Sequence, residues 1–483
     1  MTVPKILFTS PLQPIGGSSA DVYTWNKPLA TVRLFFSFLN HPGLGFLKSN
    51  LPIDILEYPS SPQFEMALQT PPDILGISFH INETEIALAM AKQARTKGVK
   101  EVWAGNYGSY NPAIAKEFDR LFTGWSEFAL AEALDSTRSA QSALVHPELY
   151  AAIGVNLFPT VVLSGILFTS RGCPWTCNFC QTPDFYGKAK SLPLEEIDRI
   201  LAVYHSRGIQ GINILDENFG TFRSHARQVV KLLHKYGMRW IALSRVDTLS
   251  ENFDYWKEHG LIGAHIGIES LNQASLSGAE KRVQQSRTVD LLRRLSAHHM
   301  FVQCFYIIGF EQDTPTSIRR DITELAELDV DVVQVQILTP YPMTRQRTSI
   351  EQSYGIFDRN LSKYNSRNLV WNHPTISPEE MAELQCSADQ LIVNSGRAVR
   401  TMSKLLLFGG REKLSLDGIR MAWGMLNPNL RDLKEELRLR IAAARQWSRQ
   451  GWSAYEEYPA EAAITARSIP LRQVPIPTHA PAH

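Results

Sequence analysis

Short apolar runs alternate with helical patterns along residues 160–350, at the spacing of βα units. Six runs have the length and composition of buried strands, and the stretches between them show the 3.6-residue spacing of amphipathic helices. The runs are residues 165–170, 211–215, 240–243, 263–268, 302–309 and 332–338. Six units are fewer than the eight that close a TIM barrel. We therefore predict a (βα)6 partial TIM barrel that is open on one side.

Residues 1–140 show the same alternation over shorter strands, which predicts an N-terminal α/β domain with a Rossmann-like parallel sheet. Its strands are expected near residues 6–8, 53–56, 74–78, 102–104 and 121–122, with a helix over 84–97 that ends at Gly98. Glycine and polar residues follow the strands, where such sheets bind ligands, although ordinary turns have the same composition. Residues 140–163 are interpreted as a connector into the barrel.

Three of the five cysteines, Cys173, Cys177 and Cys180, follow the first barrel strand at C-x3-C-x2-C spacing. Thiolates are the ligands of iron–sulfur clusters, and three of them leave one iron of a four-iron cluster open. Zinc would need a fourth ligand, and the nearest histidines, His146 and His205, are distant in the sequence. Five cysteines in 483 residues are too few for a disulfide scaffold. We predict a cluster, with structural zinc or inert, unpaired thiols as the alternatives.

The triplet, with the aromatic residue Phe179 before its last cysteine, resembles the signature of the radical S-adenosylmethionine (SAM) superfamily. The resemblance implies that Cys173, Cys177 and Cys180 bind a [4Fe-4S] cluster whose open iron is chelated by SAM. In that superfamily, one electron from the cluster cleaves SAM to a 5′-deoxyadenosyl radical, which abstracts hydrogen from unreactive carbon. The cofactor carries this chemistry, while the protein positions it and excludes water.

Polar residues at the ends of the later barrel strands are candidates for the SAM site, by analogy with motifs of the superfamily. A carboxylate can bind the ribose hydroxyls or the methionine ammonium group, and an arginine can pair with the methionine carboxylate. We assign Glu217, Arg245, Glu269 and Ser270 to SAM, and Gly309 to a close approach of the backbone to adenine. The alternative for each is a helix N-cap or a salt bridge at the rim.

The N-terminal region resembles the cobalamin-binding domain that precedes the radical SAM core in one class of the superfamily. The matching elements are residues 73–78, the strand into Ala104-Gly105, and residues 123–130. Asn106-Tyr107 stands where relatives usually have Gly-Gly-x-His, and Trp125-Ser126 interrupts a turn that is usually Gly-Glu-Gly-Glu-like. The chain has no Asp-x-His-x-x-Gly motif. The resemblance therefore implies a corrinoid without a histidine ligand on its cobalt.

The C-terminal third is predicted to be helical, with a cap over residues 351–465 and a disordered, proline-rich tail over 469–483. Ser377-Pro378 is a strong helix start, followed by Met381, Leu384, Ala388 and Leu391 on one face. Basic and apolar residues are mixed over 395–450. This mixture favours a solvated face of the cap, with peripheral membrane contact as the alternative.

The resemblance implies a cobalamin-dependent methyltransferase that acts on an unactivated carbon of a small or lipophilic metabolite. The alternatives are a radical SAM oxidation, cyclisation or rearrangement without methyl transfer, and a non-catalytic zinc protein. The enzyme would need an electron donor such as flavodoxin or ferredoxin. A net charge of +1 gives no indication of nucleic acid. No apolar run reaches membrane-spanning length and residues 1–5 lead into a strand pattern, so a cytoplasmic protein is expected.

Overall fold

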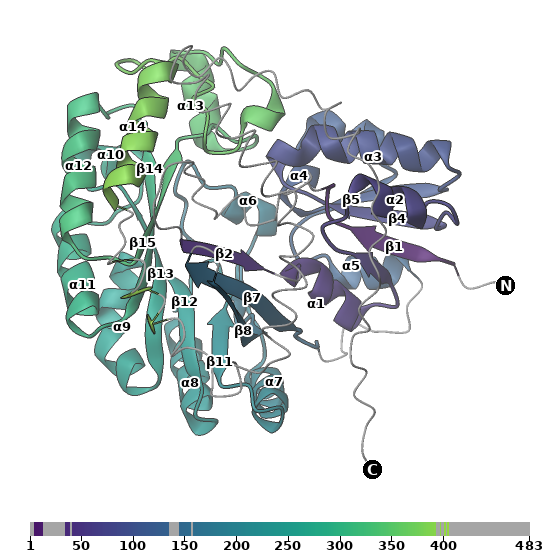
Figure 1. The fold of residues 1–483 in the computed structure, drawn as a ribbon, viewed down its shortest axis with the longest axis horizontal. Helices are drawn as coiled ribbons and strands as arrows, with labels where there is room; N and C mark the ends of the chain where they lie inside the picture. Colours follow the sequence, from purple (N-terminus) through teal and green to yellow (C-terminus); the bar gives the residue numbers. More distant parts are fainter. Residues whose placement is uncertain are drawn as a thin grey trace.

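The computed structural model describes residues 4–12, 34–38, 41–134, 144–155 and 158–392, together with residues 397, 400, 401, 403 and 404. The described strands form two large sheets and one small ribbon. The N-terminal sheet lies on one side of the molecule, and the larger sheet, with helices along its outer face, lies on the other (Figure 1). This arrangement confirms the predicted α/β fold with a parallel N-terminal sheet and a partial barrel.

The N-terminal sheet is parallel and has the strand order β3-β1-β4-β5-β6. The strands are β1 (Ile6–Thr9), β3 (Asp54–Leu56), β4 (Ile74–Ser78), β5 (Glu101–Gly105) and β6 (Arg120–Phe122). The helices are α1 (Pro42–Asn50), α2 (Ser61–Ala67), α3 (Thr84–Thr96), α4 (Asn106–Ser109) and α5 (Glu127–Ala133), with 3-10 turns at Ile81–Glu83 and Pro112–Glu117. The order reverses between β1 and β4, and ligands bind at the carboxyl ends of strands beside such a reversal.

The larger sheet contains the six predicted barrel strands in sequence order, all parallel. They are β8 (Phe158–Leu167), β11 (Gly211–Ile214), β12 (Arg239–Arg245), β13 (Leu261–Glu269), β14 (Phe301–Ile308) and β15 (Val332–Ile337). The outer helices are α7 (Leu194–Ser206), α8 (Arg223–Lys235), α9 (Val246–Glu258), α11 (Gln285–Ala297) and α12 (Pro315–Glu327), with the short α10 (Gln273–Gly278). Because β15 and β8 do not pair with each other in the described sheet, the barrel is open.

The predicted connector is wrong for most of its length. Residues 140–163 contain β7 (Glu148–Val155) and the first part of β8, which pair as an antiparallel hairpin. On its other side β7 pairs with β2 (Leu34–Phe38), a strand from the N-terminal part of the chain. Pro159 falls inside β8, opposite Gly154. Proline and glycine usually mark strand ends or bulges, and the pattern therefore indicated a loop.

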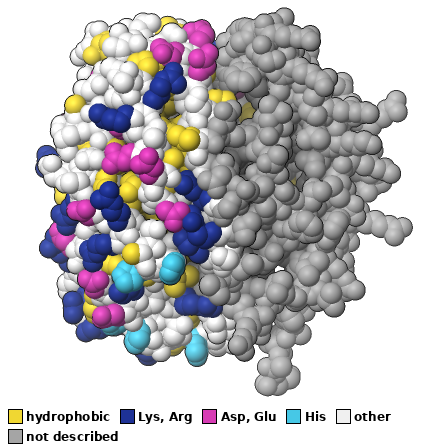
Figure 2. Space-filling view, turned by 60° about the vertical axis from the view of Figure 1, so that its left-hand side comes forward, with side chains coloured by type: hydrophobic (Ala, Val, Ile, Leu, Met, Phe, Trp, Pro, Cys, Tyr) yellow, Lys and Arg dark blue, Asp and Glu magenta, His cyan; other side chains and the backbone are white. Residues whose placement is uncertain are grey.

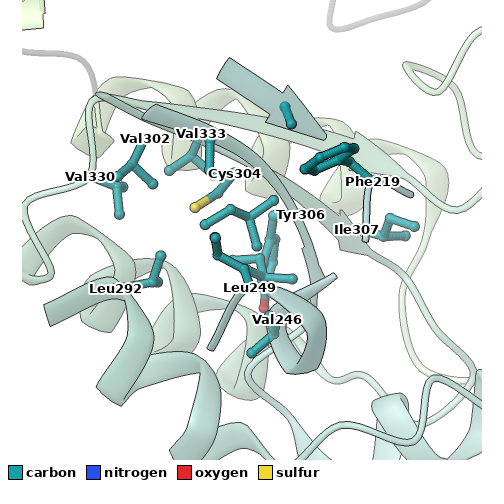
Figure 3. Close-up of a cluster of buried hydrophobic side chains, with 14 of the residues drawn as sticks. Phe219, Val246, Leu249, Leu292, Val302, Cys304, Tyr306, Ile307, Val330 and Val333 are labelled. Carbon is teal, nitrogen blue, oxygen red and sulfur yellow. The ribbon is translucent and has the colours of Figure 1, made fainter. Parts of the chain in front are cut away.

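The barrel core lies between the strands and the outer helices. Along β14 the even-numbered residues Val302, Cys304, Tyr306 and Ile308 are buried, and Figure 3 shows three of them among side chains of β15 and the helices. Gln303 and Phe305 on the opposite face are only partly buried, because they point into the barrel. Cys304 is completely buried and is part of this core, as expected for a cysteine inside a strand.

The C-terminal part begins with α13 (Arg345–Ser353), followed by a largely non-helical stretch and α14 (Pro378–Ile392). The Ser377 hydroxyl accepts the Glu380 N–H at 3.2 Å, which is the N-cap that the sequence predicted. Met381, Leu384 and Ala388 are buried. Leu391 is 49% exposed and Ile392 is buried in its place, so the predicted apolar face is wrong at its last position. Beyond 404, the predicted cap and tail lie outside the described residues.

Figure 2 shows an outer face of the molecule on which basic, acidic and histidine side chains are interspersed. Several of these charges form exposed pairs, such as Arg294 with Asp254 at 3.1 Å and Lys235 with Asp198 at 2.8 Å. Interspersed charges of both signs give a solvated surface without a field of one sign. In the part of the chain that the structure describes, no helix combines the length and the hydropathy that a membrane span requires.

Candidate functional site

The cysteine loop begins at the carboxyl end of β8, and a buried carboxylate fixes its start. Asp216, after β11, accepts the Thr169 N–H at 2.7 Å and the hydroxyls of Thr169 and Ser170 at 2.5 and 2.7 Å. Burial raises the pKa of Asp216. The short strand β9 (Ser170–Arg171) follows and pairs with β10 (Lys190–Ser191), and Gly172 turns the chain with φ +80°. The loop that carries the three cysteines is therefore held at both ends.

The three predicted cluster ligands lie close enough to influence one another electrostatically, and the Cys177 sulfur accepts a hydrogen bond from Arg245 at 3.7 Å. Burial raises the pKa of the Cys173 and Cys180 thiols, while the nearby Trp175 and Thr182 oppose this shift. The pKa of Cys173 is raised to about 11, so a metal must displace the thiol proton. The charged donor on the Cys177 sulfur suits a thiolate ligand of a cluster.

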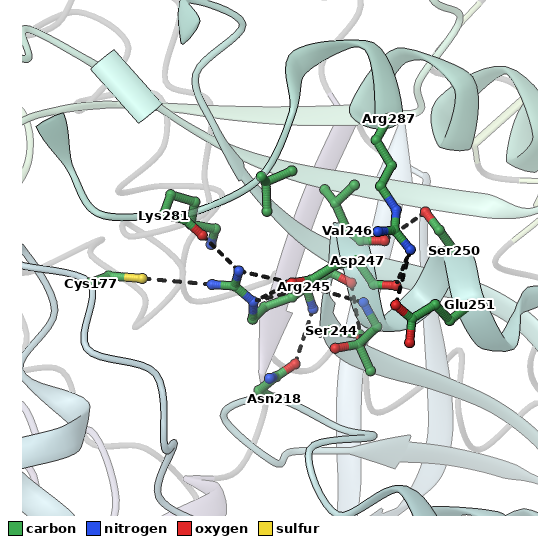
Figure 4. Close-up of polar contacts among 12 residues, drawn as sticks. Cys177, Asn218, Ser244, Arg245, Val246, Asp247, Ser250, Glu251, Lys281 and Arg287 are labelled. Carbon is green, nitrogen blue, oxygen red and sulfur yellow. Dashed lines mark hydrogen bonds and ion pairs between the residues drawn. The ribbon is translucent and has the colours of Figure 1, made fainter. Parts of the chain in front are cut away.

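Arg245 is at the centre of the polar network in Figure 4. Its side chain is 6% exposed, and every guanidinium nitrogen has a partner within the protein. It binds Asp247 through two nitrogens, at 3.0 and 3.1 Å, and donates to the Lys281 carbonyl oxygen at 2.7 Å as well as to Cys177. The guanidinium also stacks on the Trp175 ring at 4.0 Å. Arg245 thus binds the cysteine loop directly.

Glu269 forms a buried ion pair with Lys281 at 2.7 Å, with side chains 10% and 6% exposed. Glu269 has φ +61°, in the left-handed region that non-glycine residues rarely adopt and that is often found at functional sites. Its carboxylate lies over Gly267, where an added Cβ would be 2.5 Å from Glu269 Oε1. Lys281 connects the pair to the cysteine loop, because its carbonyl oxygen accepts from Arg245, which also donates to Cys177.

The other predicted SAM residues have protein partners of their own. Glu217 accepts the Gly172 N–H at 2.8 Å, and burial raises its pKa. The Ser270 hydroxyl accepts the Asn272 N–H at 3.0 Å, as in a local turn. Phe179 packs edge-on to Phe310, with ring centroids 6.1 Å apart.

Gly309 has φ +86°, and an added Cβ there would be 2.8 Å from Met381 Cε in α14. Its N–H is bound by Asp313 at 2.9 Å. The structure therefore explains this glycine by the turn and by the packing of α14. Its predicted approach to adenine stays a prediction.

The described residues contain no group of side chains that matches a zinc site. Within them, no three His, Cys, Asp or Glu side chains are grouped closely enough to hold one metal ion. A zinc ion needs its ligands within about 2.3 Å of a single point.

A pocket of about 190 Å³ lies between the carboxyl ends of the N-terminal strands and the start of the cysteine loop. One wall consists of residues from β4, β5 and the turn after β6, including Ser78, Gly105 and Gly124. The opposite wall includes Phe168 and Arg171 beside the cysteine loop and Tyr186 after it, in α6 (Thr182–Tyr186). The two sheets thus share one pocket at the ends of their strands.

Residues 167–322 match the sequence family described as Radical SAM superfamily, which includes the cysteine loop and β11 to β14. This stretch is a radical SAM domain. Such a domain uses a [4Fe-4S] cluster and SAM, so the resemblance predicted from the cysteine triplet is confirmed. Cys173, Cys177 and Cys180 lie within this stretch and stay the predicted ligands of the cluster.

Two curated relatives are methyltransferases. An uncharacterized methyltransferase of Pyrococcus horikoshii is 28% identical over 225 residues, and the match covers 46% of this chain and 49% of that protein. The chain thus spans about half the length of this relative. The bacteriochlorophyllide d C-8(2)-methyltransferase of Chlorobaculum tepidum is 24% identical over 330 residues, covering 62% of this chain and 72% of that protein.

A solved structure has the same fold. The radical S-adenosylmethionine methyltransferase TsrM from Kitasatospora setae, with cobalamin and a [4Fe-4S] cluster bound, superposes with a TM-score of 0.52 at 14% identity. The superposition covers 73% of this chain and 78% of that one. At this identity the likeness concerns the arrangement of the two sheets.

Three residues at the site were missed in the sequence. Thr182 lies near Cys180, Lys281 pairs with Glu269, and the Tyr107 hydroxyl, in α4, is hydrogen-bonded to Thr182. Thr182 could have been found from its position two residues after Cys180. Lys281 and Tyr107 had no such signal, because their contacts join separate elements of the fold.

Proposed function

We propose that the chain is a cobalamin-dependent radical SAM methyltransferase that methylates an unactivated carbon of a small or lipophilic metabolite. The observation that carries the proposal is the shared pocket, which the N-terminal sheet and the cysteine loop line together. A methyl donor bound by that sheet would lie beside the radical SAM centre. The proposal is also supported by the methyltransferase relatives and by the fold of TsrM.

The pocket suits part of a corrinoid. Gly105 opens into it, because an added Cβ would have no neighbour closer than 4.0 Å. Phe8, Trp103 and Phe122 provide aromatic lining. A cavity of about 150 Å³ accepts a benzene ring, so about 190 Å³ suits a compact ring group, such as the base of a nucleotide tail.

Among the described residues that line this pocket, no histidine nitrogen is placed to bind cobalt. His41 lines it, but His41 Nδ1 accepts the Leu44 N–H at 3.1 Å as the N-cap of α1. The proton of the neutral imidazole must then be on Nε2, which removes that nitrogen as a metal ligand. Burial lowers the pKa of His41 to about 4, so the ring stays neutral. These contacts support the histidine-off mode expected from the sequence.

The protein's own residues would position the cofactors and exclude water. When bound, the reduced cluster supplies the electron that cleaves SAM, and the corrinoid supplies the methyl group. Arg245 holds Cys177, and Asp216 fixes the start of the loop. The buried Glu269–Lys281 pair offers a carboxylate for the methionine ammonium and an ammonium for its carboxylate. Lys281 therefore joins the SAM site, and Arg245 acts there by positioning the loop.

Glu217, Ser270, Phe179 and Gly309 keep their proposed places around SAM, at the ends of β11, β13 and β14 and in the cysteine loop. The electron is proposed to come from a small carrier such as flavodoxin or ferredoxin. A substrate carbon would have to reach both the SAM side and the corrinoid side of the shared pocket. This requirement favours a small or flexible metabolite over a folded macromolecule.

The test is corrinoid retention by anaerobically purified protein reconstituted with iron, sulfide and hydroxocobalamin. The wild type should keep one corrinoid after gel filtration, whereas Gly105→Leu should lose it and keep its iron, because leucine fills the pocket at a φ of −138° that any residue adopts. With substrate, 5′-deoxyadenosine and S-adenosylhomocysteine should form in equal amounts. A wild type that retains no corrinoid would rule out methyl transfer from cobalamin. 5′-Deoxyadenosine without S-adenosylhomocysteine would instead favour cyclisation or oxidation.

A further inference from the structure

The shared pocket is lined by both flanks of the cysteine loop. Arg171 stands two residues before Cys173, and Phe185 and Tyr186 of α6 stand five and six residues after Cys180. All three flanking residues line the pocket, and most of its other lining residues belong to the N-terminal sheet and its helices. A ligand that fills the pocket therefore contacts the chain on either side of the three cysteines.

Two tyrosines that follow β5 bind α6 to the N-terminal sheet. The Phe185 ring is buried and stacks on the Tyr107 ring, with centroids 4.2 Å apart and planes at 25°. Tyr110 packs edge-on to the same phenylalanine, with centroids 5.8 Å apart. The hydroxyls of Tyr107 and Thr182, at the two ends of this contact, are hydrogen-bonded at 3.1 Å. These contacts fix the position of Phe185 relative to the end of β5.

The turn after β6 contacts α6 through its backbone. Gly124 has φ +62°, and an added Cβ there would be 2.8 Å from the Phe185 carbonyl oxygen and 3.4 Å from Tyr186 Cα. Both the backbone conformation and the close approach require glycine. Phe185 is therefore held by the turns that follow β5 and β6. These turns lie at the carboxyl edge of the sheet, where such sheets bind their ligands.

A short hydrogen-bonded path leads from Phe185 back to the last cysteine. The Phe185 N–H donates to the Gln181 carbonyl oxygen at 2.9 Å, and Gln181 follows Cys180 directly. The Cys180 N–H donates to the Cys177 carbonyl oxygen at 3.2 Å. The Gln181 side chain donates to the Pro342 carbonyl oxygen at 2.9 Å, which holds the start of α6 on the barrel. A displacement of Phe185 would thus reach Cys180 through one helical turn.

We propose that Phe185 is a positioning residue through which a corrinoid in the pocket and the cluster strengthen each other's binding. A cluster held by three cysteines fixes the loop between Arg171 and α6, because metal binding is coupled to local folding. A ligand in the pocket packs against the same two flanks. Since both hold the flanks in one arrangement, each raises the affinity of the chain for the other. The inference rests on the proposed function for the identity of the pocket ligand.

The experiment is anaerobic equilibrium dialysis of methylcobalamin against the full-length chain, with and without its reconstituted cluster and in the absence of SAM. The methyl group occupies the upper face of the cobalt, so free thiols of the cluster-free chain do not bind there. The dissociation constant should be at least about fivefold lower with the cluster, since couplings between sites are typically about 5- to 150-fold. Equal dissociation constants in the two forms would overturn the coupling and leave the corrinoid site intact. Absence of binding to both forms would overturn the proposed function and this inference together.

Two variants test the role of Phe185. Phe185→Leu keeps an apolar side chain but removes the stacking on Tyr107, so the ratio of the two dissociation constants should fall toward one, whatever the change in each. Leu47→Ala is the matched control, because Leu47 lines the pocket from α1 and lies outside both flanks of the cysteine loop. It should raise both dissociation constants by the same factor and keep the wild-type ratio. An unchanged ratio in Phe185→Leu, or an equal fall in Leu47→Ala, would show that Phe185 only packs against the ligand.

Discussion

The ion pair between Arg171 and Glu127 should be the strongest polar link between the N-terminal sheet and the cysteine loop. Arg171 lies two residues before Cys173, and Glu127 is in the first turn of α5. Their side chains are only 10% and 4% exposed. The guanidinium is also surrounded by aromatic rings, with its carbon 4.6–4.8 Å from the centroids of Phe46, Trp125 and Phe168. We predict the effect of removing the carboxylate charge by Glu127→Gln.

Removing one partner of a buried pair costs about 3–5 kcal/mol, because the other charge stays buried and unpaired. Contacts with aromatic rings stabilise such an unpaired cation by about 0.5–2 kcal/mol, which offsets part of this cost. Glu127→Gln should therefore lower the free energy of unfolding by about 3 kcal/mol. Removing both charges with Arg171→Met should cost less than the sum of the single changes, since no unpaired charge is left.

The assay is urea unfolding of the metal-free protein, followed by tryptophan fluorescence, which Trp125 makes sensitive to this region. The control is Asp254→Asn in the pair with Arg294, whose side chains are 71% and 43% exposed. That change should cost less than about 1 kcal/mol. If Glu127→Gln costs no more than Asp254→Asn, or if the double change equals the sum of the single ones, the reasoning about this buried pair is wrong.

Three further outcomes are expected. Cys177→Ala should abolish the iron and sulfide content measured after anaerobic reconstitution, whereas Cys304→Ala, in the buried core, should leave it unchanged. Glu269→Gln should keep the cluster and weaken SAM binding measured by calorimetry by roughly 10- to 150-fold, the loss of one charge-assisted hydrogen bond of about 1.5–3 kcal/mol; unchanged affinity would remove Glu269 from the SAM site. Burial raises the pKa of Asp313 to about 6, so the stability that its protonated form gives is lost as the pH rises from about 4 to about 6. One pKa unit corresponds to about 1.36 kcal/mol. The free energy of unfolding of Asp313→Asn, measured with urea, should therefore rise by about 3 kcal/mol relative to the wild type between about pH 4 and about pH 6. Parallel pH profiles of the two proteins would contradict this.

The barrel strands were predictable because strands of a parallel sheet are buried on both faces and therefore appear as continuous apolar runs. Each predicted run overlaps an observed strand, and the cysteine loop begins at the end of β8, as expected. The hairpin of β7 and β8 was not predictable in this way. Its pairing depends on β2, a partner far away in the sequence, and its proline and glycine resemble those of a loop.

The sequence indicates which residues are candidates for the site, but it indicates much less about which residues each of them contacts. The cysteines follow from their spacing alone. The sequence analysis assigns Arg245 to a carboxylate of SAM. In the structure, Arg245 donates to Cys177, 68 residues away, and to the Lys281 carbonyl oxygen, 36 residues away. Strand order fixes which side chains meet across a barrel mouth, and no local pattern contains that information. The same limit applies to Tyr107, whose partner Thr182 is 75 residues away.

The antiparallel strands β2 and β7 have a practical consequence for dividing this protein. They continue the barrel sheet past β8, so the N-terminal part of the chain shields the hydrogen-bonding groups on that side of β8. A fragment that starts at residue 160 would expose β8 as an unpaired edge, and exposed edge strands recruit other chains and aggregate. The barrel should therefore be insoluble when expressed without residues 34–155. For this chain, the unit that folds in isolation has to include both the sheet that carries the cysteines and the N-terminal segment that closes its edge.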